Sequence, residues 1–282
     1  MLNKPLKMKT TALKYFCRGL LIATCFFLAT TALFAQQAKK AATADYHNLY
    51  SAGVANALLG GLYDAYYPYK QLKLHGNFGL GAPDKLDGEM IMLNGNIYHF
   101  KHTGKTALAG ANEKTAYAVV CFFHADKVIK PGRSMNKAEL FRYLDSVLNN
   151  QNGIYAIHIS GNFRKVKTRA FPPVHNKPYP SMASLLHTQR FFEFNNINGD
   201  LVGYKLPAFM EGTYISGYHF HFLSDKKDSG GHMTDVVINN VTIEIDPLTS
   251  YTTELPQTDA FKHYDFTKDR TKEIESVENG KK

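Results

Sequence analysis

The sequence predicts an α+β fold that is rich in β-strands, with two lobes, mixed sheets and a few helices. Several apolar stretches alternate in the manner of half-buried strands, and Asn94-Gly95 stands between two of them as a hairpin turn. The clearest helical stripe covers residues 136–148. No glycine-rich phosphate loop follows a strand and opens a helix, which disfavours a doubly wound nucleotide-binding sheet.

The first 35 residues predict a secretory signal peptide. They carry five basic residues and no acidic one, and an apolar run over residues 20–34 ends just before Ala35. This run is shorter than the about 20 residues that usually span a membrane, so we expect cleavage after Ala35 rather than a membrane anchor. The mature chain is then expected in the periplasm or outside the cell.

Composition and charge exclude several classes of protein. With 44% apolar and 20% charged residues, the chain is neither disordered nor a coiled coil. The formal charge of +9 suggests an anionic partner, but 28 basic and 24 acidic residues remain once the leader is removed. We therefore expect no nucleic-acid partner. Cys121 is then the lone cysteine, and a buried, inert thiol is expected.

The predicted elements of the N-terminal half follow in chain order. Apolar residues recur at helical spacing from Leu49 to Leu62, and residues 89–100 form two strands around the turn. A buried strand follows at 116–123. Asn136 caps the helix at 136–148, with Glu139 three residues further on. With a strand at 154–163, these elements predict an N-terminal α/β lobe over residues 36–165.

The C-terminal half is predicted as a β-rich lobe over residues 166–282. A loop is expected from Arg164, just before this lobe begins, through the proline-rich stretch from Pro172 to Pro180. Strands are expected at 214–223 and 233–245, joined by a turn at 224–231. The two lobes are expected to act as one functional unit.

The most informative segment is Gly217-Tyr218-His219-Phe220-His221-Phe222. Side chains alternate along a strand, so His219 and His221 share one face and the aromatic rings pack on the other. His232 follows the turn, where the returning strand brings it beside the pair. Three imidazoles suit zinc, with manganese, iron or copper as alternatives, and the open fourth position is typical of a catalytic site. The alternative is three ordinary histidines on a polar sheet face.

The segment GTYISGYHFHFLSDKKDSGGHMTD (residues 212–235) resembles the signature of the α-acetolactate decarboxylase family. Further similar segments, in the family's order, are HGNFGLGAPDKLDGEMIMLNGNIYH (75–99), KVKTRAFPPVHNKPYP (165–180) and ELPQTDAF (254–261). The resemblance runs from about residue 48 to the C-terminus. One departure is Ala82, where the family usually has threonine after GLG.

The resemblance implies a set of site residues and a homodimer. His219, His221 and His232 are expected to hold a zinc ion, and Glu89 and Arg169 to be catalytic. A glutamate near the C-terminus is expected to reach the metal centre. By spacing it is Glu278, with Glu275 as the alternative. Without the resemblance, Arg169 would belong to a solvated basic cluster, Glu89 to a turn, and Glu278 to a frayed helix end.

The activity that the resemblance implies is decarboxylation of 2-acetolactate to acetoin and CO2. The metal would act as an electron sink, Arg169 would hold the substrate carboxylate, and Glu89 or Glu278 would donate a proton. Two other classes stay open. One is an exported metal-binding protein on the same scaffold without turnover. The other is a cupin-like metal enzyme, which normally has a glutamate where this chain has Asp225. Because acetolactate forms in the cytosol, export leads us to hypothesise that the substrate has left that compartment.

Overall fold

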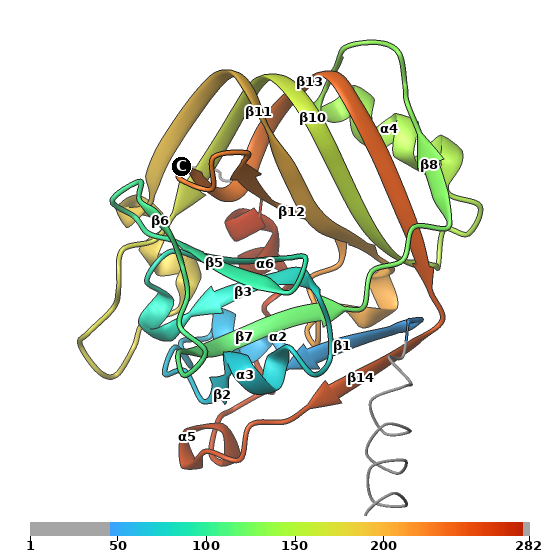
Figure 1. The fold of residues 1–282 in the computed structure, drawn as a ribbon. Coiled ribbons are helices and arrows are strands. Elements are labelled where there is room, and N and C mark those ends of the chain that lie inside the picture. The colour runs from blue at the N-terminus through green and yellow to red at the C-terminus, as the bar shows by residue number, and fades with distance from the viewer. Residues whose placement is uncertain (1–45, 279–282) are drawn as a thin grey trace, which may run out of the picture. The chain divides into compact units, whose positions relative to one another are not determined.

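The computed structural model describes residues 46–278, without the side chains of Glu275 and Glu278. The predicted signal peptide and its cleavage site lie outside this range, so cleavage and export stay predictions. In the described range, no helix combines the length and apolar character needed to cross a membrane. Two β-sheets organise this range, and the long strands of one of them stand out in the ribbon (Figure 1).

The first sheet has eight strands in the order β14-β1-β7-β3-β4-β5-β6, with β2 paired to β7. The pair β1–β14 is parallel and the other pairs are antiparallel, so the sheet is mixed. Its strands are β1 (Asn48–Ala52), β2 (Tyr67–Pro68), β3 (Phe78–Pro83), β4 (Glu89–Leu93), β5 (Asn96–Phe100), β6 (Thr106–Leu108), β7 (Lys114–Cys121) and β14 (Ser250–Glu254).

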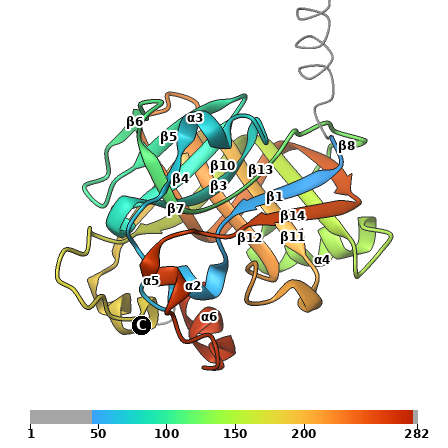
Figure 2. The ribbon, with the colours of Figure 1, turned by 90° about the horizontal axis from the view of Figure 1, so that it is seen from below.

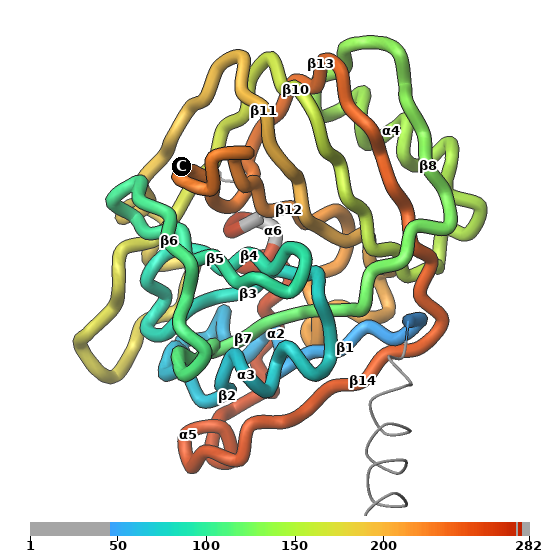
Figure 3. Tube along the Cα trace, viewed as in Figure 1, coloured from blue at the N-terminus to red at the C-terminus, as the bar shows by residue number. Residues whose placement is uncertain are grey.

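The second sheet has six strands, and four of them pair in a closed ring. The strand β10 pairs with both β11 and β13, while β12 pairs with β11 and, over three residues, with β13. The path of the long strands is clear in the trace (Figure 3). The strands are β8 (Lys127–Ile129), β9 (Met135–Asn136), β10 (Ile154–Ala170), β11 (Arg190–Leu206), β12 (Gly217–Ser224) and β13 (Gly230–Leu248).

The helices are short apart from α4, which covers one face of the second sheet. Its apolar stripe packs on Phe220 and Phe222 of β12, and Asn136 forms the predicted capping box with Glu139. Figure 2 shows α5 and α6, in red, on the same side as α2. The helices are α2 (Ala55–Leu59), α3 (Tyr69–Leu72), α4 (Lys137–Val147), α5 (Asp259–Lys262) and α6 (Thr271–Glu278), with 3-10 turns η1 (Asp84–Leu86), η2 (Met182–Thr188) and η3 (Ala208–Met210).

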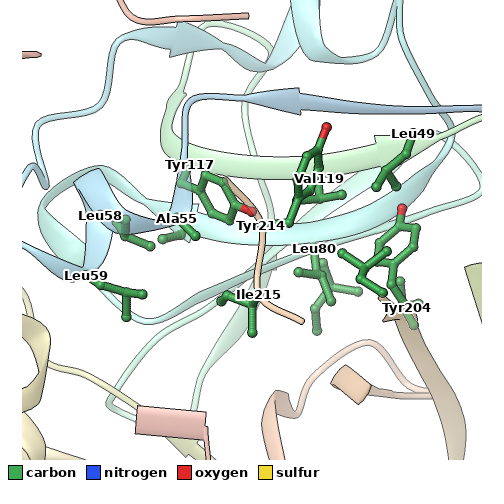
Figure 4. Close-up of a cluster of buried hydrophobic side chains, with 14 of the residues drawn as sticks. Leu49, Ala55, Leu58, Leu59, Leu80, Tyr117, Val119, Tyr204, Tyr214 and Ile215 are labelled. Carbon is green, nitrogen blue, oxygen red and sulfur yellow. The ribbon is translucent and has the colours of Figure 1, made fainter. Parts of the chain in front are cut away.

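A hydrophobic core joins the two sheets and α2. Leu58 and Leu59 of α2, Leu80 of β3 and Tyr204 of β11 are among its buried members, and Figure 4 shows their side chains gathered around the strands. Each of these side chains is at most 6% exposed. Leu58, Leu59 and Leu80 of this core also line a pocket that contains His219, His221 and His232, so the close-packed core provides rigid walls for that pocket.

The α+β class with mixed sheets and few helices is confirmed. The turn at Asn94-Gly95 also forms as predicted, with φ of 52° and 73° at the two residues, which suits a type I′ hairpin. The helical spacing from Leu49 is misleading, because Asn48–Ala52 form β1 between β7 and β14.

The loop predicted from residue 164 is also wrong, since β10 continues to Ala170. Lys165 and Lys167 lie on the more exposed face of this strand, where they pair with Asp235 and Glu193. Because such charged residues also suit a solvated loop, the strand was not recognised in the sequence. The predicted lobe boundary at residue 165 falls inside this strand, and the division into lobes stays a prediction.

Candidate metal centre

Three histidines converge at the point where the ring of strands closes. His219 and His221 lie on β12 and His232 on β13, and His221 pairs directly with His232 across the two strands. Nε2 of His219 lies 3.2 Å from Nε2 of His221 and 3.1 Å from Nδ1 of His232. The side chains of Phe220 and Phe222 point to the opposite face, towards α4. The shared face predicted for His219 and His221 therefore forms.

A β-bulge decides which way His232 points. Lys167 pairs with Asp235 but Thr168 pairs with Met233, so Thr234 is an extra residue in β13. Val236 and Met233 both face the core under α4, although they lie an odd number of positions apart. Without the bulge, His232 would share the face of Val236, because alternate residues of a strand point the same way. The bulge therefore turns His232 towards the other two imidazoles.

Burial keeps the three imidazoles in the neutral form. Burial lowers the pKa of His219 to about 3, with the charge of Arg169 acting in the same direction. The pKa values of His221 and His232 also lie well below the usual range, mainly because of burial. Nδ1 of His221 lies 3.0 Å from the carbonyl oxygen of Met90, which can only accept a hydrogen bond. The proton therefore sits on Nδ1 and the lone pair of Nε2 faces the centre.

This donor set fits a metal ion. The three candidate ligand atoms all lie within 4.8 Å of one another in the described part of the chain. Zinc–nitrogen bonds of about 2.0–2.1 Å in a tetrahedron place the ligand atoms roughly 3.3 Å apart. The observed separations of 3.1 and 3.2 Å from His219 are close to this value. The cluster could therefore hold a divalent ion.

A buried ion pair lies beside the histidines. Glu89 begins β4 and Arg169 lies near the end of β10, so the pair joins the two sheets. Glu89 Oε1 accepts a hydrogen bond of 3.0 Å from Nη1 of Arg169, and Glu89 Oε2 lies 3.4 Å from Nε2 of His221. Glu89 is 6% exposed and Arg169 is 3% exposed. Charges buried this deeply need partners, which each supplies to the other.

The turn before Glu89 is strained and tied to the segment after Arg169. Lys85 and Leu86 have φ of 55° and 60°, values that residues other than glycine rarely adopt. The N–H of Gly88 donates to the carbonyl of Phe171, and the N–H of Val174 donates to the carbonyl of Lys85. These bonds hold the turn so that Leu86 faces the pocket and Glu89 meets Arg169. Strain of this kind is often found beside functional residues.

These groups line a small pocket with one polar and one apolar side. Its cavity volume is about 30 Å³, so the space left between the lining side chains is small. The polar side consists of the three histidines, Glu89 and Arg169. The apolar side is formed by Leu58, Leu59, Leu80, Gly81, Ala82, Leu86, Tyr117, Phe171, Met182 and Ile215. The pocket suits a compact molecule with both polar and alkyl groups.

The structure brings five of the six predicted site residues together. His219, His221, His232, Glu89 and Arg169 all line the pocket. The side chain of Glu278 lies outside the described residues, as does that of its alternative, Glu275. The helix α6 that carries them does reach the site, because the carbonyl of Val277 accepts a hydrogen bond of 3.3 Å from Nη2 of Arg169.

Sequence reasoning missed the apolar side of the pocket. Phe171 lies in the segment predicted to be a loop, two residues after Arg169. Its ring lies 5.0 Å from the guanidinium carbon of Arg169. Ala82, the position that departs from the family pattern, lines the pocket and is 4% exposed. The contacts of Val277 could not be predicted because no local pattern links it to Arg169.

Comparison with known proteins gives a consistent family. The family model for alpha-acetolactate decarboxylase matches residues 49–268. The alpha-acetolactate decarboxylase of Methanosarcina mazei is 36% identical over 230 residues, which cover 82% of this chain and 80% of that protein. The enzyme of the same name from Bacillus subtilis is 32% identical over 231 residues, covering 82% of this chain and 90% of that one.

Solved structures agree with these relatives. The crystal structure of alpha-acetolactate decarboxylase from Bacillus subtilis superposes with a TM-score of 0.79 at 32% identity, covering 82% of this chain and 99% of that chain. A Staphylococcus aureus protein of unknown function, described as similar to alpha-acetolactate decarboxylase, gives a TM-score of 0.78 at 25% identity. The superposed region covers 83% of this chain and 100% of the Staphylococcus aureus chain.

Proposed function

Because this chain belongs to the alpha-acetolactate decarboxylase family of enzymes, we propose that it decarboxylates 2-acetolactate with a divalent metal ion held by His219, His221 and His232. Zinc is the metal we expect. The observation that carries this proposal is the convergence of three neutral imidazoles with the Glu89–Arg169 pair in one buried pocket.

The reaction breaks the bond between the carboxylate carbon and C2 of the substrate. The electron pair of that bond moves towards the neighbouring ketone, and one proton then adds to C2, so that acetoin and CO2 are the products. A divalent ion bound by the three histidines would supply Lewis acidity towards the substrate oxygens. The carbonyl of Met90 contributes by keeping the ring of His221 in the tautomer that can bind a cation.

Arg169 is the group we assign to the substrate carboxylate. Its planar guanidinium lines the pocket, and carboxylates are well matched to such a fork of N–H donors. Its orientation is fixed from two sides, by Glu89 Oε1 at 3.0 Å and by the carbonyl of Val277 at 3.3 Å. A guanidinium that is already oriented loses little entropy when a substrate binds, which favours a productive geometry.

Glu89 is the group we assign to proton delivery. Its carboxyl group lies inside the pocket, with Oε1 on Arg169 and Oε2 near His221. A proton carried on Oε2 would lie on the side of the metal centre, where C2 of a bound substrate would be protonated. The apolar wall formed by residues such as Leu80 and Ile215 would hold the methyl groups and exclude water.

Metal removal tests the proposal directly. The purified protein is incubated with racemic acetolactate, and acetoin and CO2 are measured before chelation, after chelation and after zinc is returned. We expect acetoin and CO2 in equal amounts, loss of turnover on chelation and its recovery with zinc.

Turnover that persists in protein shown to be free of metal would contradict the metal mechanism. Tight binding of acetolactate without CO2 release would favour the non-catalytic alternative. The dimer implied by the resemblance stays a prediction.

A further inference from the structure

The C-terminal part of the chain returns to the pocket from outside the two sheets. After β14 it passes through α5 to α6, on the side of the molecule that also carries α2 (Figure 2). Ile274 and Val277 of α6 are 5% and 1% exposed and belong to the same core as the pocket residues Leu58 and Met182. The helix also contacts η2, which carries Met182. The family match ends at residue 268, before this helix begins.

The helix α6 fixes one side of the Arg169 guanidinium. Nη1 of Arg169 donates to Glu89, whereas Nη2 donates to the carbonyl of Val277 at 3.3 Å. A planar group held at both ends has a defined direction, so the position of α6 decides where the Nη2 side of Arg169 points. Because α6 has only eight residues, packing rather than its own stability must hold it in place.

A notch at Gly60 receives the segment that leads into α6. Gly60 ends α2, and a Cβ atom there would lie 1.4 Å from Oη of Tyr264. The same Cβ atom would lie 2.8 Å from Nη2 of Arg270. Oη of Tyr264 also donates a hydrogen bond of 3.4 Å to the carbonyl of Asn56, one turn earlier in α2. The absent side chain of Gly60 therefore makes the space into which Tyr264 fits.

Arg270 links this notch to the first turn of α6. Its guanidinium carbon lies 5.7 Å from the centre of the Tyr264 ring, and the residue is 8% exposed. Nη1 of Arg270 pairs with Glu273, inside the helix. The backbone carbonyl of Arg270 accepts a hydrogen bond of 2.9 Å from the N–H of Ile274. The contacts thus form a continuous path from Gly60 through Tyr264 and Arg270 to the helix.

We propose that residues 264–278 form a strap whose docking in the Gly60 notch sets the direction of the Arg169 guanidinium through the carbonyl of Val277. Tyr264 and Arg270 are positioning residues, because they act on the substrate only through α6 and Arg169. This inference rests on the proposed role of Arg169 in binding the substrate carboxylate. It adds a requirement for catalysis that lies about 100 residues from Arg169 in sequence, at residues that touch neither substrate nor metal.

Gly60→Ala tests the strap, because its methyl group would displace Tyr264 from the notch. We expect KM for acetolactate to rise about tenfold, and by a larger factor than kcat falls, since binding of the carboxylate is what weakens. Hydrogen exchange of the amides in 271–278 should become faster, and this readout needs neither substrate nor metal. Gly110→Ala is the matched control, because Gly110 is exposed and its Cβ atom would meet only the side chain of Glu113, at 3.3 Å.

A second pair of variants separates docking from general damage. Tyr264→Ala should reproduce both effects, whereas Tyr264→Phe should keep KM close to that of the unchanged protein. The double variant Gly60→Ala/Tyr264→Ala should be no worse than either single variant, because both act on one contact. Faster exchange in α6 with an unchanged KM would overturn the proposal, as would a higher KM with unchanged exchange. If the unchanged protein does not turn over acetolactate, the proposed function fails, while exchange in α6 still decides whether the strap docks in the notch.

Discussion

Two clusters of polar residues on the second sheet contain histidine, and they differ in the charge that surrounds it. At one end, His219, His221 and His232 face one another beside Arg169. Further along β10, His158 lies between two carboxylates instead. Its Nδ1 is 2.8 Å from Oε2 of Glu244, and its Nε2 is 2.9 Å from Oδ1 of Asp200. Lys227 completes this second cluster, with Nζ 2.7 Å from the other oxygen of Asp200.

The neighbouring charges decide what each histidine does. Burial lowers the pKa of His219, and the nearby cation Arg169 lowers it further. Burial also tends to lower the pKa of His158, but hydrogen bonds and charges from Asp200 and Glu244 outweigh it, so the pKa of His158 is raised. A neutral imidazole can bind a metal, whereas an imidazolium between carboxylates forms ion pairs. Burial alone therefore does not identify a ligand.

The largest expected difference between the clusters is in metal binding. His221→Ala removes one of the three proposed nitrogen ligands and the hydrogen bond to Met90, so we expect loss of stoichiometric metal and a fall in turnover of at least about 10³-fold. His158→Ala makes the same chemical change in the other cluster and should keep its metal. Metal content by elemental analysis and initial rates of acetoin formation measure both. Equal metal content in the two variants would break the distinction between the clusters.

The carboxylate beside each cluster provides the next comparison. Glu89→Gln keeps the shape of the side chain but removes its acidic proton, so we expect kcat to fall about 10²- to 10⁴-fold with metal content retained. The rates should be measured well below the melting temperature, because Arg169 loses the charge of Glu89 beside it in a buried site. The matched change Glu244→Gln should leave kcat within about twofold. A normal kcat for Glu89→Gln would remove Glu89 as the proton donor.

The smallest expected effect is on stability and depends on pH. Because the pKa of His158 is higher in the folded protein than in the unfolded chain, its stabilising contribution is complete below the ordinary pKa of about 6.5. It is lost as the pH rises through the raised value. Glu244→Gln should therefore lower the free energy of unfolding by about 1 kcal/mol at pH 6, and by less at pH 9. Urea unfolding at the two pH values measures this. An equal loss at both would mean that His158 is not charged.

The sequence predicted the local parts of the site better than its long-range contacts. The shared face of His219 and His221 follows from strand alternation, and the helix around Leu140 and Leu144 follows from its cap and stripe. The family resemblance, rather than any local pattern, pointed to Glu89 and Arg169. Their hydrogen bond joins residues that lie 80 positions apart, which periodicity does not report.

Two features of the fold could not be predicted from the sequence, because they lack the residue patterns that usually mark a strand or a β-bulge. The segment from Lys165 to Ala170 is a strand with charged residues on its exposed face and proline soon after it, so it resembles a loop. The β-bulge at Thr234 has no glycine or proline to mark it. Its presence depends on the pairing of β13 with β10, which is a property of the sheet.

The bulge ties the direction of His232 to the number of residues before Val236. Deleting Thr234 alone would preserve all three histidines and the turn before them. If the pairing of β13 with β10 stayed in place, Met233 would directly precede Asp235, and regular alternation would keep Met233 in the core under α4 and His232 towards the other two imidazoles. A regular strand that kept Thr234 would instead turn His232 into that core. The loss of this one residue should therefore be better tolerated than the loss of the bulge with all residues kept.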